Sequence, residues 1–125
     1  MVEEPAMDAE KAQQPRRLTV VAAATDGIRV LTVAGDIDHD TGDTLRQALD
    51  VSGLPRPRIV VDMRQVTFMD STGLNVLIGT YKTVTAAGGW LRLAAPTENV
   101  QRLLRLVGID TIIDCHPTLH HALTN

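Results

Sequence analysis

The sequence has few aromatic residues, a single cysteine and no excess of basic charge. Phe68, Tyr81 and Trp90 make up the 2% of aromatic side chains in 125 residues. Proteins that hold single-stranded nucleic acid by base stacking use several aromatics, so the composition argues against that class. Twelve basic and fifteen acidic residues give a formal net charge of −3. A protein that binds DNA or an anionic membrane normally carries a basic face, so we expect neither nucleic acid nor membrane as a partner.

The single cysteine also indicates a compartment. Cys115 has no second cysteine with which to form an internal disulfide, as is typical of a reducing environment. No apolar run is long enough to span a bilayer, and residues 1–17 lack the apolar core of a secretory signal. We therefore expect a cytoplasmic protein with a disordered leader over residues 1–17 and one domain over residues 18–125.

Hydrophobic patterns and breakers predict the element order β-β-α-β-α-β-α-β-α. Asp26-Gly27 between two β-rich runs is a strong signal for a hairpin. The consecutive Ile59, Val60 and Val61 indicate a strand that is covered on both faces. The expected fold class is therefore α/β, with a mixed sheet that is mostly parallel after the hairpin and about four packed helices. Strands are predicted over residues 18–25, 28–35, 58–63, 90–94 and 111–114, and helices over residues 42–51, 72–87, 96–107 and 117–123. The helix over residues 96–107 is expected to bury Val100, Leu103, Leu104 and Val107.

The segment from Val66 to Leu74 joins a buried strand to an amphipathic helix. Within it, Asp70, Ser71 and Thr72 are all residue types that cap helices. A helix start carries unpaired N–H groups and the positive end of the dipole, so a phosphate is stabilised there. Two interpretations stay open: one of these residues simply caps the helix, or Ser71 accepts a phosphoryl group. A catalytic serine needs a base beside it, which the local sequence lacks, whereas a kinase substrate does not; Ser71 is therefore favoured as an acceptor over a catalyst.

A second polar segment, residues 35–43, carries four aspartates and no lysine or arginine. It follows the second predicted strand, so it will lie near Ser71 if the two strands are neighbours. It is either a solvated loop in which Thr41 caps the next helix, an acidic rim for a basic partner, or a site for a hard cation. The cation is the weakest of these, because the spacing does not match an EF-hand loop. The aspartates are Asp36, Asp38, Asp40 and Asp43.

Other possible sites have less support. A zinc site built from Cys115, His116, His120 and His121 would need a second ligand pair at matching spacing, and adjacent helical histidines point apart. A surface helix with histidines is favoured instead. Hydrolase, phosphate-loop and dinucleotide motifs are all missing from the sequence. We predict no catalytic residue, no metal and no cofactor.

Three landmarks together resemble the STAS domain of bacterial anti-sigma factor antagonists, over residues 18–123. The middle landmark is specific in this topological place, and the other two support it. They are Gly35-Asp36-Ile37-Asp38 with Thr41; Asp62 with Phe68-Met69-Asp70-Ser71-Thr72-Gly73-Leu74; and Ala87-Gly88-Gly89 with Leu91-Arg92-Leu93, Val100, Leu103-Leu104 and Val107-Gly108-Ile109.

The resemblance implies a regulatory cycle. The cognate anti-sigma factor, which is also a serine kinase, would phosphorylate Ser71. The unphosphorylated protein would bind that anti-sigma factor and free a sigma factor, the phosphorylated protein would not bind, and a PP2C-type phosphatase would reset it. The implied partner-binding residues are Asp36, Asp38, Thr41, Asp70, Ser71, Thr72, Gly73 and Asn75.

Two alternatives remain. The same fold could serve as a regulatory subunit of a stress-signalling or lipid-transport assembly. A receiver domain phosphorylated on Asp62 is less favoured. Receivers need an acidic pair after the first strand and a lysine after the last, and neither is found here.

Overall fold

The computed structural model describes residues 17–125, so the predicted leader lies outside the described residues except for Arg17. Five strands form one mixed sheet in the order β1-β2-β3-β4-β5. The pair β1–β2 is antiparallel, and the three other pairs are parallel. The predicted α/β class and mixed sheet are thus confirmed. The elements are β1 (Thr19–Thr25), β2 (Ile28–Ile37), α2 (Gly42–Ala48), β3 (Arg58–Met69), α3 (Ser71–Ala86), β4 (Trp90–Ala94), α4 (Glu98–Leu106), the 3₁₀ turn η1 (Ile109–Thr111), β5 (Asp114–His116) and α5 (Leu119–Thr124).

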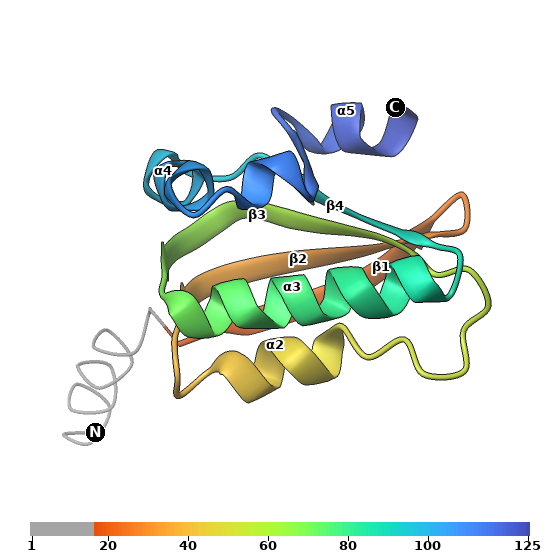
Figure 1. The fold of residues 1–125 in the computed structure, drawn as a ribbon, viewed down its shortest axis with the longest axis horizontal. Helices are drawn as coiled ribbons and strands as arrows, with labels where there is room; N and C mark the ends of the chain where they lie inside the picture. The colour runs from red at the N-terminus through yellow and green to blue at the C-terminus, as the bar shows by residue number, and fades with distance from the viewer. Residues whose placement is uncertain (1–16) are drawn as a thin grey trace, which may run out of the picture.

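Helices cover both faces of the sheet (Figure 1). α2 and α3 lie on one face, and α4 and α5 lie on the other. The larger core cluster includes Leu31, Leu45 and Leu77 beneath α2 and α3, and it also takes in Val100 and Leu104 of α4. A smaller cluster lies beneath α5 and contains Ile28, Val60 and Ala122. Burying both faces stabilises a central strand rich in β-branched residues, which explains why the run in β3 is continuous.

The leading hairpin has the predicted turn. Asp26 and Gly27 both have positive φ, 52° and 79°, as a two-residue type I′ turn requires. The prediction of a strand covered on both faces is also confirmed, since Ile59, Val60 and Val61 are fully buried.

Several predicted boundaries are wrong. β3 continues to Met69 rather than ending at Met63, because β2 keeps pairing with it through two register shifts. α2 ends at Ala48, three residues early. The predicted strand over 111–114 is replaced by η1 and by β5 at Asp114–His116. Val107 is 52% exposed, because α4 ends before it at Leu106.

Among residues 17–125, no helix combines the length and apolar character needed to cross a bilayer.

Candidate functional site

The two polar segments meet at the carboxyl ends of β2 and β3. β2 and β3 are parallel neighbours, and their last paired residues are Ile37 and Met69. The backbone N–H of Asp70 donates to the carbonyl of Ile37 over 3.1 Å. The expectation that residues 35–43 lie beside the start of the Ser71 helix is therefore confirmed.

Asp70 caps α3, and Ser71 does not. The Asp70 backbone is extended, and its Oδ1 accepts a hydrogen bond from the Thr72 N–H at 2.8 Å. This is the usual geometry of a helix N-cap, in which the side chain satisfies an N–H of the first turn. Ser71 is the first residue of α3 and is exposed. The hydroxyl therefore lies at the positive end of a 16-residue helix, where another protein can reach it.

Glycines allow close packing at this end, Gly42 between α2 and α3 and Gly73 between α3 and the ends of β2 and β3. A Cβ on Gly42 would lie 2.6 Å from Cγ2 of Thr72, and a Cβ on Gly73 would lie 2.6 Å from Cγ of Met69. Gly73 is buried and Thr72 is half-buried. Thr72 and Gly73 therefore hold the helix start in place and are less available to a partner than Ser71 is.

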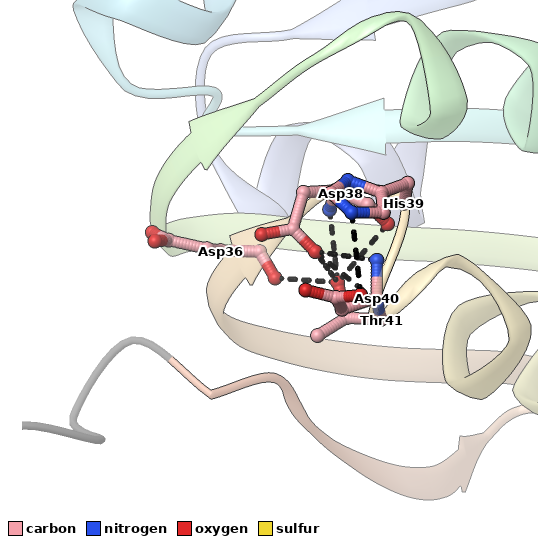
Figure 2. Close-up of polar contacts among 5 residues, drawn as sticks. All are labelled: Asp36, Asp38, His39, Asp40 and Thr41. Atoms are coloured by element: carbon pink, nitrogen blue, oxygen red, sulfur yellow. Dashed lines mark hydrogen bonds and ion pairs between the residues drawn. The ribbon is translucent and has the colours of Figure 1, made fainter.

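The acidic loop, residues 38–41 between β2 and α2, is held in one shape by hydrogen bonds (Figure 2). The Oδ1 of Asp38 accepts from the N–H groups of Asp40, at 2.9 Å, and of Thr41, at 3.2 Å. Thr41 Oγ1 accepts from the Asp38 N–H and donates to the carbonyl of Asp36, both at 2.9 Å. Thr41 is the N-cap residue of α2 by position, but its side chain makes no capping bond to that helix. The prediction that Thr41 caps α2 is therefore wrong in mechanism, because its hydroxyl ties the loop together instead.

A shallow cavity of about 310 Å³ lies between this loop and the end of β3. It is lined by Asp36, Asp38, Thr67 and Phe68. Thr67 Oγ1 donates to Asp36 Oδ1 at 2.6 Å, and Phe68 is 49% exposed. Sequence reasoning included Phe68 in the motif that carries the resemblance, but it did not assign Thr67 or Phe68 to the partner surface. An exposed aromatic ring beside carboxylates is suited to a protein interface.

Asn75 is exposed one turn further along α3. It lines a groove of about 580 Å³ between α2 and α3, together with Arg46 and Gly79. Asn75 therefore faces the groove between α2 and α3, whereas Asp36 and Asp38 line the separate cavity beside the end of β3.

The described residues offer limited support for a metal. Possible ligand atoms of Asp38, His39 and Asp40 lie within 4.8 Å of one another, but His39 and Asp40 are exposed. Exposed acidic groups of this kind are common without an ion, and the absence of a metal stays a prediction.

The C-terminal histidines are arranged differently from a zinc site. Cys115 and His116 are consecutive in β5, so they point to opposite faces of the sheet. Burial, with Asp110 and Asp114 nearby, raises the pKa of the Cys115 thiol to about 11. His116 Nδ1 lies 2.6 Å from His121 Nδ1, a contact that sequence reasoning missed. Burial and the neighbouring His121 lower the pKa of His116.

Asp62 is not open to phosphorylation. It is 1% exposed, and both of its carboxylate oxygens accept from the Arg64 guanidinium, at 3.2 and 2.9 Å. The receiver alternative required this carboxylate to be accessible.

A family model of the STAS domain matches residues 19–122. The chain belongs to the STAS domain family. The anti-sigma F factor antagonist of Paenibacillus polymyxa is 32% identical to this STAS domain over 100 residues, which are 78% of this chain and 86% of the relative. A solved anti-sigma factor antagonist from Mycobacterium paratuberculosis has a TM-score of 0.79 and 32% identity, covering 88% of this chain and 94% of that one. The phosphorylated form of the Bacillus protein SpoIIAA shares the fold, with a TM-score of 0.63 at 18% identity over 85% of this chain and 96% of its own.

Proposed function

We propose that this STAS domain is an anti-sigma factor antagonist whose binding is switched off by phosphorylation of Ser71. It would bind an anti-sigma factor that is also a serine kinase, and so release a sigma factor for transcription. A PP2C-type phosphatase would restore the binding form. The observation that carries the proposal is the exposed Ser71 hydroxyl at the start of α3, beside an acidic loop.

The partner surface follows from the charges at this end. Asp36 and Asp38 are half-buried carboxylates that flank the exposed ring of Phe68. Such a surface fits a partner with basic groups around an apolar contact. We place Thr41, Asp70, Thr72, Gly73 and Asn75 in or directly beneath this surface.

The switch itself is electrostatic. A phosphate on Ser71 adds about −1.5 to −2 charges and three acceptor oxygens. The start of α3 tolerates this charge, because the helix dipole and free N–H groups stabilise an anion there. Asp70 and the acidic loop repel it, and a desolvated dianion without a partner costs several kcal/mol in an interface. Phosphorylation should therefore leave the fold intact and prevent docking.

The chemistry of transfer comes from the partner. A serine acts as a nucleophile in its own protein only with a base beside it, whereas a kinase supplies that base to its substrate. We accordingly propose a regulatory role for this chain in the cytoplasm, with catalysis by the kinase and the phosphatase.

The test is a phosphorylation assay with the anti-sigma factor of the same organism and ATP. Mass spectrometry should map the phosphate to Ser71, and Ser71→Ala should abolish incorporation. Ser52→Ala is the matched control, since Ser52 is the other serine of the chain and is also exposed. Incorporation that persists in Ser71→Ala, or that requires Ser52, would contradict the proposal.

A further inference from the structure

The outer edge of β1 is unusual for an edge strand. β1 stands at the end of the sheet order and pairs with β2 alone among the described strands. Its sequence, TVVAAAT, contains neither charge nor proline, and Val21 is 64% exposed. Edge strands normally carry lysine, proline or a bulge that prevents pairing with another chain. β1 has none of these and pairs with β2 without a register shift.

The free hydrogen-bonding groups of this edge follow from the turn. Thr25 and Ile28 flank the two-residue type I′ turn, so their backbone groups face each other. Alternation along an antiparallel strand then directs the N–H and C=O groups of Val20, Ala22 and Ala24 away from β2. These three residues form a symmetric set centred on Ala22.

That symmetry fits a second copy of the same strand. In an antiparallel pairing centred on Ala22, Val20 of one copy lies opposite Ala24 of the other, and Ala22 lies opposite itself. Every outward-facing group then finds a partner, whereas a shift of one residue would pair outward groups with inward ones.

Charge favours an antiparallel arrangement of the two strands. Arg17 and Asp26 are exposed and stand at opposite ends of β1. In the pairing centred on Ala22, Arg17 of each copy lies opposite Gly27 of the other, one residue away from Asp26. The two ends of the interface therefore carry opposite charges that match twice, as a two-fold axis requires.

We propose that β1 pairs with β1 of a second copy, giving a two-fold symmetric dimer with one continuous sheet. The exposed Leu54 and the β1 alanines line a cavity of about 330 Å³ at this edge, which adds apolar area. A strand edge buries less than the roughly 800 Å² per partner of a standard stable interface, so the dimer should dissociate on dilution. The proposal does not rest on the function of Ser71.

A site-directed cross-link tests the register. The variant Ala22→Cys, combined with Cys115→Ala, places two thiols on the axis. Opposed residues in such a pair have Cα atoms about 5.5 Å apart, within disulfide range. The control Thr19→Cys with Cys115→Ala places its two thiols about 20 Å apart by strand rise. Mild oxidation should link the first variant into dimers and leave the second monomeric.

Sedimentation of the full chain over a concentration series tests the association itself. We expect a monomer–dimer equilibrium that Ala22→Lys weakens at least tenfold, because two like charges meet on the axis. Ala86→Lys, at an exposed residue of α3, makes the same charge change elsewhere and should leave the equilibrium unaltered.

Three results would overturn the proposal. One is a wild-type chain that stays monomeric at every concentration, which would also be the outcome if the chain's own N-terminal residues covered β1. Another is equal cross-linking of the two cysteine variants. The last is a series of larger oligomers, which a closed two-fold contact does not produce.

Discussion

The starts of α3 and α4 differ although each helix follows a parallel strand. α3 is capped by the Asp70 side chain and has no acidic residue in its first turn. α4 begins after Thr97, whose hydroxyl donates to the Val66 carbonyl at 3.1 Å and makes no capping bond. Glu98 already supplies a negative charge to the first turn of α4.

This difference explains why only one of these two helix starts is suited to a phosphate. Every helix start has unpaired N–H groups and a favourable dipole, so those features alone do not distinguish α3 from α4. What differs is the hydroxyl that each offers. Ser71 is exposed, whereas Thr97 is half-buried and bonded to β3.

The largest expected effect is on partner affinity. Ser71→Glu should weaken binding to the anti-sigma factor by about 10- to 100-fold, or about 1.4–2.7 kcal/mol, because it places a charge in the interface. Asn99→Glu adds the same charge at the exposed start of α4 and should leave affinity unchanged. Calorimetric titration measures both. Equal losses of affinity in the two variants would mean that the added charge weakens binding through the net charge of the protein and not through its position.

Two glycine substitutions in α3 test how tightly the start of this helix is packed. Gly73→Ala should destabilise the fold by about 1–3 kcal/mol, because the new methyl group meets Met69 and Ile37. Gly79→Ala, in open space on the same helix, should stabilise by about 0.5–1 kcal/mol. Urea unfolding gives both values. The corresponding third residue of α4, Val100, is already a buried side chain. A neutral Gly73→Ala would show that α3 can move outward at little cost.

Another capping residue should be able to replace Asp70 at the start of α3. Asp70→Ala should cost about 1 kcal/mol, and Asp70→Asn should retain most of the stability, because asparagine caps about as well as aspartate. Both follow from the same unfolding measurement. An Asp70→Ala variant as stable as the wild type would mean that the bond to Thr72 contributes nothing.

The smallest expected effect is that of a negative charge at residue 71 on the stability of the fold. Ser71→Glu and Ser71→Gln should differ in unfolding free energy by less than about 1 kcal/mol, since a helix dipole contributes only about 0.3–1 kcal/mol at an exposed end. A loss of several kcal/mol in Ser71→Glu would indicate that phosphorylation acts by unfolding the start of α3.

The parts of the fold that the sequence predicted are those encoded by local pattern. The Asp26-Gly27 turn, the continuous run from Ile59 to Val61 and the apolar stripe of α3 each have one dominant local cause. The proximity of Ser71 to the acidic loop was predictable as well, because neighbouring parallel strands have their carboxyl ends at the same end of the sheet.

The errors occur where tertiary contacts decide. Arg64 and Gln65 look like the end of a strand, yet β2 pairs with β3 beyond them to Met69. Residues 111–114 have strand propensity, but β4 pairs instead with Asp114–His116. In the extended part of β3, Phe68 pairs with Asp36 of β2, which brings its exposed side chain beside the acidic loop. The role of Thr41 in tying its loop, rather than capping α2, also depends on backbone geometry that no residue pattern specifies.

The antiparallel pairing of β1 has a consequence for the order of folding. Its partners in β2 lie within 15 residues of chain, from Thr25 with Ile28 to Thr19 with Ala34, whereas Arg29 in β2 pairs with Ile59. A hairpin of this kind closes in about 1–10 μs, while a non-local parallel pair must first overcome a greater loop-closure entropy. The nascent chain should therefore display the uncharged strand before the rest of the sheet exists, so that refolding yield is expected to fall as protein concentration rises.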